Sequence, residues 1–351
     1  MRKQNDMIDL LKFLAAIMVV GIHTGPLKSF SDLANNVIFQ GVARLAVPFF
    51  FAVSAYFLFR KINNNPMDGK AIVSKYVIRL AKLYLFWFII LFPVIIRIRL
   101  LNFVPGYGLK MSLIIFLREI IWCSSFQGSW FLNASIVCAI IVYVCSKRMS
   151  GGGLTIMGMI CFLFTVVSSG YYNIFAPVIG PFYEKFILIF TEPYNTLFAG
   201  IVYFVMGKYL AETKKEDLFG WKVRKTGLLI SLAAVVIEAY VMHPHTYFRA
   251  PDVFLSLLPA TYFILVNTIY FDKELPIPRN ILSFFRNSSI IMYILHFQVL
   301  NFMSGYGAEH GIVFPNTFIS YLVIVGICIV ISFTLLKLQK IKGLHWLQYS
   351  H

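Results

Sequence analysis

The sequence predicts an all-α membrane protein, a polytopic transmembrane helical bundle of about ten spans plus one re-entrant or interfacial helix. Hydrophobic residues make up 59% of the 351 residues and charged residues only 13%, a balance that excludes a soluble domain. The apolar residues form runs of about 20, the helix length that crosses a hydrocarbon core of about 30 Å. Basic residues stand at the ends of these runs. We therefore expect a multi-pass protein of the cell membrane.

Ten apolar runs have the length of a membrane span. They cover residues 8–27, 37–59, 76–96, 130–146, 154–170, 194–211, 226–242, 253–271, 286–304 and 316–336. An eleventh run, Met111 to Ser124, is shorter and holds Arg118 next to Glu119, both costly to bury in lipid. The chain has no internal repeat and no loop long enough for a soluble domain. We therefore expect residues 1–351 to form one membrane domain.

The basic loops predict the orientation. If the run 111–124 spans, the strongly basic segment Lys208–Lys225 falls outside the cell, against the positive-inside rule. If that run is re-entrant or interfacial, most basic loops and both termini are cytoplasmic, and the loop with Arg97, Arg99 and Lys110 is the one exception. The segments then left outside are poor in cations and lie around Ser31, Pro177, His243–Asp252 and Gly305–Pro315.

The net charge of +16 has the same explanation. Because the 31 Lys and Arg residues stand at the ends of apolar runs, membrane topology and anionic lipid headgroups account for them. We expect a lipid bilayer as partner and no nucleic acid. The five cysteines lie mostly inside apolar runs without CxxC spacing, so we expect no metal site.

The first span carries ionisable residues on one face. Lys12 and His23 are eleven positions apart, which puts them within about 20° on the helix face and about 16 Å apart along the axis. Asp9 lies one turn before Lys12 and can neutralise it. Two interpretations stay open: a functional groove, or residues that snorkel at the interface while His23 caps the helix before Gly25.

Three further cationic positions are candidates. Arg79 and Lys82 share a face at the entrance of the third span and can bind phosphate, although positive-inside anchoring explains them equally well. Arg44 lies about two turns into the second span, where it needs a carboxylate, a carbonyl or water. Pro48 can kink that helix and free a carbonyl nearby, so either a wet cavity or a local structural arginine accounts for Arg44. His296, in a late span, can face the core groove or serve as a packing histidine.

Taken in order, these motifs resemble the acyltransferase-3 family of integral membrane acyltransferases. The resemblance runs over nearly the whole chain and rests on Lys12-x10-His23, Phe50-Phe51-x-x-Ser54, the basic pair at Arg79, Trp130-Phe131-Leu132, and a Ser…Tyr…His pattern ending at His296. Two positions depart from the family pattern. Lys82 replaces a second arginine, and Ser54-Ala55 replaces Ser-Gly, changes that affect phosphate recognition and helix packing.

The resemblance implies an O-acyltransferase that moves an acyl group, usually acetyl, from cytoplasmic acetyl-CoA to a hydroxyl of a cell-envelope glycan or a related small molecule. In that case His23 serves as the catalytic base or carries the acyl group. Lys12, Arg79 and Lys82 bind the anionic donor, and Arg44 stabilises developing charge or lies with His296 on the acceptor side.

A second interpretation is a transporter or binding module for a small polar substrate such as an amino acid. The sequence around Arg44 also resembles the membrane portion of vancomycin-resistance serine racemases. The chain continues about fifteen residues past its last predicted span, too few for a racemase domain. Lys12, Arg44 and His23 can equally line a substrate path.

Overall fold

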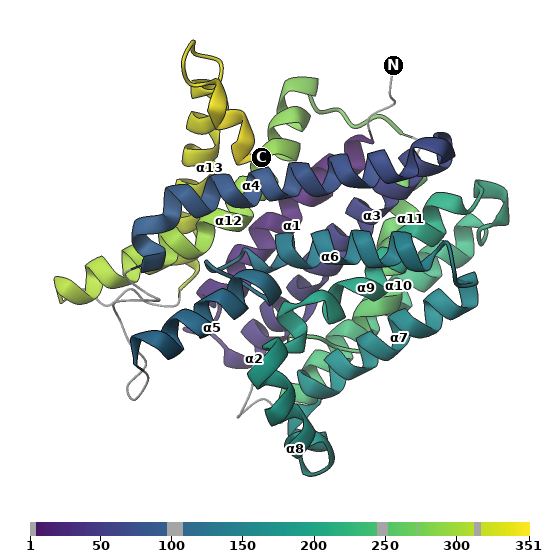
Figure 1. The fold of residues 1–351 in the computed structure, drawn as a ribbon, viewed down its shortest axis with the longest axis horizontal. Coiled ribbons are helices and arrows are strands. Elements are labelled where there is room, and N and C mark those ends of the chain that lie inside the picture. Colours follow the sequence, from purple (N-terminus) through teal and green to yellow (C-terminus); the bar gives the residue numbers. More distant parts are fainter. Residues whose placement is uncertain (1–4, 97–107, 244–251, 272, 312–316) are drawn as a thin grey trace.

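A computed structural model describes residues 5–96, 108–243, 252–271, 273–311 and 317–351. These residues form a bundle of helices and no strand (Figure 1), which confirms the predicted all-α class. The helices are α1 (Asp6–Thr24), α2 (Asp32–Asn35), α3 (Ala46–Asn64), α4 (Gly69–Ile96), α5 (Leu109–Trp122), α6 (Trp130–Cys145), α7 (Gly151–Ser168), α8 (Tyr172–Phe190), α9 (Leu197–Glu212), α10 (Trp221–Met242), α11 (Leu257–Ile269), α12 (Arg279–Glu309) and α13 (Phe318–Leu338). Short 3-10 and π turns are η1 (Asn36–Gly41), η2 (Val42–Leu45), η3 (Pro66–Asp68), η5 (Pro193–Asn195), η6 (Lys215–Asp217) and η8 (His345–Ser350). The predicted topological exception at Arg97 and Arg99 lies outside the described residues.

The apolar helices confirm a multi-pass membrane protein. In the described part of the chain, seven helical segments are long and apolar enough to cross a membrane, and α6 and α11 are shorter apolar helices. Each predicted span coincides with a helix: α1, α3, α4, α6, α7, α9, α10, α11, α12 and α13. The shorter run that begins at Met111 forms most of α5, whose 14 residues extend about 21 Å, less than the hydrocarbon core.

The second predicted span is less regular than expected. A π turn, η1, and a 3-10 turn, η2, precede α3, so the irregular backbone lies before Pro48 instead of at a kink caused by it. Pro48 occupies the first turn of α3, where a helix tolerates proline because the missing N–H has no helical partner. Gly41 packs against Ala239 of α10 at this break. Arg44 therefore projects from a 3-10 turn.

Helix α8 occupies a segment that the sequence predicted only as an outside loop around Pro177. Its composition would allow it to cross a membrane, but its neighbours show that it returns to the end where it began. Helices α7 and α9 pack antiparallel, with the Phe164 and Phe198 ring centroids 5.7 Å apart at adjoining ends. Near their middles, Gly158 lies against Val202. Helix α8 is therefore an excursion between two spans at one end of the bundle.

Helices α1 and α12 lie side by side, and two ion pairs join the first turn of α1 to the N-terminal part of α12. Asp6 Oδ1 lies 2.5 Å from Arg279 Nη1, and Asp9 Oδ2 lies 3.3 Å from Arg286 Nη1. Because both pairs follow the same order along the two helices, α1 and α12 run in the same direction. We call the end where α1 and α12 begin the basic end, and the other the opposite end.

The most extensive helix contact joins α3 and α9, and it depends on a glycine. A Cβ at Gly207 would lie 2.4 Å from the Ala52 carbonyl oxygen and 2.8 Å from the Tyr56 nitrogen. Both atoms belong to the backbone, so a side chain at residue 207 can be accommodated only if a helix shifts. Small residues at such contacts are typical of membrane helices, since they let two backbones approach closely.

Replacing Gly207 tests this contact. We expect Gly207→Ala to lower the free energy of unfolding by about 1–3 kcal/mol, because overpacking displaces α3 from α9. Gly326 in α13 is the matched control, since a Cβ there meets nothing within 4 Å and alanine is the better helix former. Thermal unfolding in detergent should show a lower midpoint for Gly207→Ala only; equal midpoints for both variants would contradict the proposed packing.

Candidate active site

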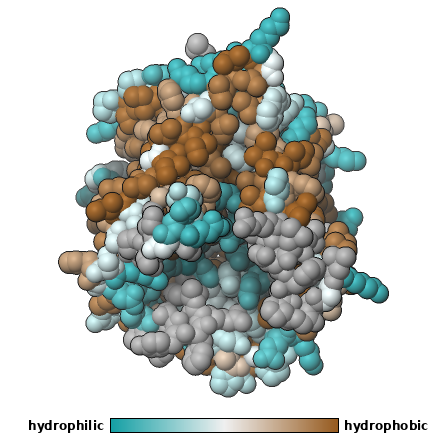
Figure 2. Space-filling view, turned by 90° about the vertical axis from the view of Figure 1, so that its left-hand side faces the viewer, coloured by the Kyte–Doolittle hydropathy of each residue, from teal (hydrophilic) through white to brown (hydrophobic). Residues whose placement is uncertain are grey.

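A cavity of about 720 Å³ lies toward the opposite end of the bundle. Figure 2 shows a hollow in which hydrophilic residues are visible. The lining comes mainly from α1, α2, η1, η2, α3, α6, α9, α11, α12 and the segments that precede α6, α9 and α11. It includes His23, Gln40, Arg44, Trp130, Tyr203, Asp252 and Tyr293. Polar and aromatic side chains that converge on one concave site are typical of small-molecule sites.

His23 faces this cavity from the last turn of α1. Its ring lies 5.2 Å from the ring of His296 and stacks on it, and it lies 4.2 Å from the ring of Phe297. His296 is only 1% exposed. The two histidines predicted from separate spans are therefore brought together, one open to the cavity and one buried behind it.

The hydrogen bond of His296 defines its tautomer. Its Nδ1 lies 3.2 Å from the Met292 carbonyl oxygen, so Nδ1 carries the proton and donates it. Its Nε2 is buried and has no hydrogen-bond partner among the described residues. An unprotonated Nε2 beside His23 can accept a proton or a hydrogen bond.

Arg44 reaches the cavity as half of an ion pair with Asp252. Its Nη2 also donates to Gln40 Oε1 over 2.6 Å. Burial raises the pKa of the Asp252 carboxyl, and the neighbouring Arg44 charge opposes that rise. The sequence predicted that Arg44 needs a carboxylate, a carbonyl or water but did not identify Asp252, which lies in a loop about two hundred residues later.

A second carboxylate holds the segment that carries Asp252. Glu238 of α10 accepts hydrogen bonds of 2.8 Å from the backbone N–H groups of Leu255 and Ser256, just before α11. The Asp252 backbone N–H donates to Ser169 Oγ over 3.0 Å. Because both ends of this short segment are fixed, the Asp252 carboxylate is directed toward Arg44.

The other predicted cations lie at the basic end. Lys12 is half-buried, with its Nζ 5.6 Å from the centre of the Phe57 ring. Arg79 lies within electrostatic range of Lys12. Arg79 and Lys82 are exposed, and the Lys82 Nζ lies 5.5 Å from the Tyr349 ring. Lys12 and Arg79 are thus brought together, while Lys82 faces η8.

The carboxylate expected to neutralise Lys12 has another direct partner. Asp9 forms its ion pair with Arg286 and interacts with Lys12 over a longer distance. Arg286, which was not predicted as a site residue from the sequence, also acts electrostatically on Lys12. The basic end therefore carries more positive than negative charge around Lys12, an arrangement that favours an anionic ligand.

These two groups of residues lie within the region that matches a known family. Residues 5–337 match the acyltransferase domain of the acyltransferase-3 family. The chain belongs to this family. The match confirms the resemblance and includes all six predicted site residues. Their individual roles stay predictions.

Three curated relatives are named as racemases. The chain is 24% identical to an amino-acid racemase of Enterococcus faecalis, over 97% of this chain and 47% of the relative. It is 28% identical to a second amino-acid racemase of the same organism, over 59% of this chain and 28% of that relative. It is 23% identical to a serine/alanine racemase of Enterococcus gallinarum over 75% and 36%. The chain thus spans less than half the length of these relatives. No solved structure matches it.

The Arg44–Asp252 pair can be tested by removing its charges singly and together. We expect Arg44→Met and Asp252→Asn each to lower the free energy of unfolding by about 3 kcal/mol, because each leaves one poorly hydrated charge without its partner. The double variant should lose less than the sum of the two. Chemical unfolding of the four proteins measures this coupling, and strictly additive losses would contradict a direct pair.

Proposed function

We propose that this protein is a cell-membrane O-acyltransferase that takes an acyl group, most simply acetyl, from cytoplasmic acyl-CoA and transfers it to a hydroxyl of an acceptor bound in the cavity. The orientation follows the positive-inside rule, so the basic end and both termini are cytoplasmic and the cavity opens outside. The observation that carries the proposal is the difference between the two ends of α1. Lys12 lies in a cationic cluster at one end, and His23 faces a polar cavity at the other.

The basic end suits the donor. Coenzyme A carries several phosphate charges, and Arg79, with its planar fork, can bind one of them bidentately. Lys12 and Lys82 add further positive charge at this end of the bundle. The pantetheine arm would then follow α1 toward His23, over the roughly 16 Å that eleven helical residues span.

At the cavity, His23 acts as a general base. Its neutral imidazole takes the proton from the acceptor hydroxyl while the hydroxyl oxygen forms a bond to the thioester carbonyl carbon. When the carbon–sulfur bond breaks, the resulting imidazolium returns the proton to the coenzyme A thiolate. Transient acylation of the imidazole is the covalent variant of this step. Because Asp252 already pairs with Arg44, we assign Arg44 to acceptor binding in preference to oxyanion stabilisation.

The acceptor is a molecule with hydroxyl groups and little net charge. Among the described cavity residues, Lys28 and Arg44 are balanced by Asp32 and Asp252. Aromatic rings from Trp130 and from tyrosines also line the cavity, and flat rings beside polar side chains can pack against a sugar while the polar groups bind its hydroxyls. An envelope glycan or a small polyol fits this description.

Purified protein in nanodiscs provides the test. We expect wild type to bind acetyl-CoA and release free CoA slowly, and His23→Ala to bind acetyl-CoA with CoA release reduced by at least about 100-fold, the usual contribution of a general base. Arg79→Ala should weaken binding by about tenfold or more, because a charged hydrogen bond is worth about 1.5–3 kcal/mol. Calorimetry and a thiol assay measure the two quantities.

Lys222→Ala is the control for a general loss of positive charge, since Lys222 is an exposed cation at the start of α10, a different helix from α1 and α4. It should bind and turn over acetyl-CoA like wild type. If wild type neither binds nor cleaves acetyl-CoA, the acyltransferase proposal loses its basis.

A second candidate is a site for a free amino acid. The names of the relatives, amino-acid racemase and serine/alanine racemase, point to amino acids, and the Arg44–Asp252 pair offers one charge for a carboxylate and one for an ammonium group. If this candidate is correct, serine will raise the thermal unfolding midpoint of wild type and leave that of Asp252→Asn unchanged. Absence of a serine shift in wild type would remove it.

A further inference from the structure

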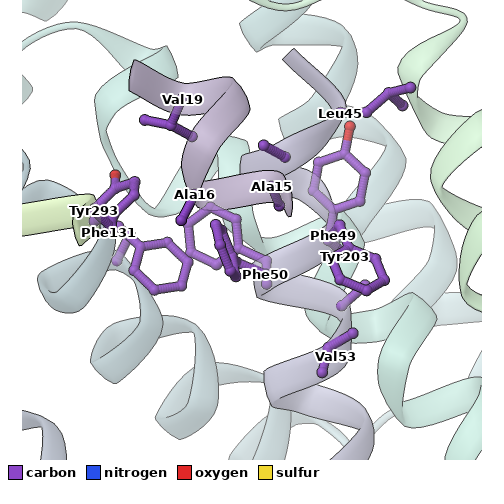
Figure 3. Close-up of a cluster of buried hydrophobic side chains, with 14 of the residues drawn as sticks. Ala15, Ala16, Val19, Leu45, Phe49, Phe50, Val53, Phe131, Tyr203 and Tyr293 are labelled. Atoms are coloured by element: carbon purple, nitrogen blue, oxygen red, sulfur yellow. The ribbon is translucent and has the colours of Figure 1, made fainter. Parts of the chain in front are cut away.

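Three aromatic rings from different helices meet in the core below the cavity. Phe50 of α3, Phe131 of α6 and Tyr293 of α12 form what we call the aromatic triangle. The ring centroids of Phe50 and Phe131 lie 6.0 Å apart, those of Phe50 and Tyr293 6.1 Å apart, and those of Phe131 and Tyr293 5.5 Å apart. Each side chain is less than 9% exposed. Figure 3 shows the three rings grouped beside α1.

The aromatic triangle lies alongside the stretch of α1 that separates its two polar ends. Ala16 and Val19 follow Lys12 by four and seven positions, so they lie on the helix face that also carries His23. Figure 3 places Ala16 and Val19 next to the triangle. Ala16 is completely buried, whereas Val19 lines the cavity. The aromatic rings therefore pack against the buried middle of α1, between the residues that face the cavity and Lys12.

The aromatic triangle lies at the floor of the cavity. Of the aromatic triangle, only Tyr293 lines the cavity, and its ring lies 6.0 Å from that of His296. Among the described residues, the cavity lining includes neither Lys12 nor Arg79. The triangle thus separates a cavity that contains His23 from the cations of the basic end.

We propose that the aromatic triangle is the partition between donor and acceptor and that it limits the length of the acyl chain that reaches His23. This inference rests on the proposed function, in which an acyl group must move along α1 from the basic end. The route passes between α1, where Ala15 and Ala16 present only methyl groups, and the rings. A close-packed interior resists added methylenes, so a short acyl group passes with small ring movements and a longer one is excluded.

The test compares CoA release from acetyl-CoA and hexanoyl-CoA by wild type and Phe50→Leu. Leucine keeps the position apolar but removes the aromatic ring, which widens the route. We expect the hexanoyl-to-acetyl rate ratio to rise by about tenfold or more, the order of discrimination that a few methylenes provide in an apolar site. Phe131→Leu should raise the ratio in the same way. It replaces Phe50→Leu in the test if that variant does not yield folded protein.

Two controls test whether a change in the rate ratio comes from loss of a ring in the aromatic triangle. Phe49 is buried on the side of α3 that faces away from Phe131 and Tyr293 (Figure 3), so Phe49→Leu should leave the ratio unchanged. Tyr293→Phe retains the ring without its hydroxyl and should also leave it unchanged. If wild type turns over acetyl-CoA but both leucine variants in the triangle keep its ratio, the inference is overturned and the proposed function stands. If wild type turns over neither thioester, both fail.

Discussion

The cost of placing charge within an apolar bundle governs the arrangement of this protein. An ionised group that lipid or dry protein surrounds must find a partner of opposite charge or water. The structure meets this requirement separately at the two ends. Asp6 and Asp9 pair with cations of α12 at the basic end, and Asp252 pairs with Arg44 at the cavity. Between these ends the bundle is apolar.

The irregular backbone before α3 lies beside the polar cavity. Its π and 3-10 turns carry Gln40 and Arg44, which both reach that cavity. Asn36 donates to the Ala239 carbonyl across the break, so α10 helps to stabilise it. Irregular backbone at membrane depth is tolerated where it is buried in protein or lines a wet cavity.

The sequence predicted the helices and the position of Lys12 and His23 on one helix face, because both follow from local periodicity and span length. It could not predict contacts between distant segments. The pairing of His23 with His296 was one open alternative, and the carboxylate opposite Arg44 was identified only by the fold. Helix α8 was missed, because the sequence predicted only an outside segment around Pro177. In the structure Pro177 and Pro181 both lie within that helix, and aromatic packing around Phe164 holds it in place.

The proposed function requires the bundle to bring two substrates together without leaving an open path for water and ions across the membrane. His23 at the cavity and Arg79 at the basic end are both exposed, so a seal has to lie between them. Bulky rings suit that position better than aliphatic side chains, since they cover a large area and can rotate about two torsions. The motif positions Phe50, Phe131 and Tyr293 are far apart in the sequence but meet at this level. Their packing gives the motifs a shared physical role in addition to any part in the chemistry.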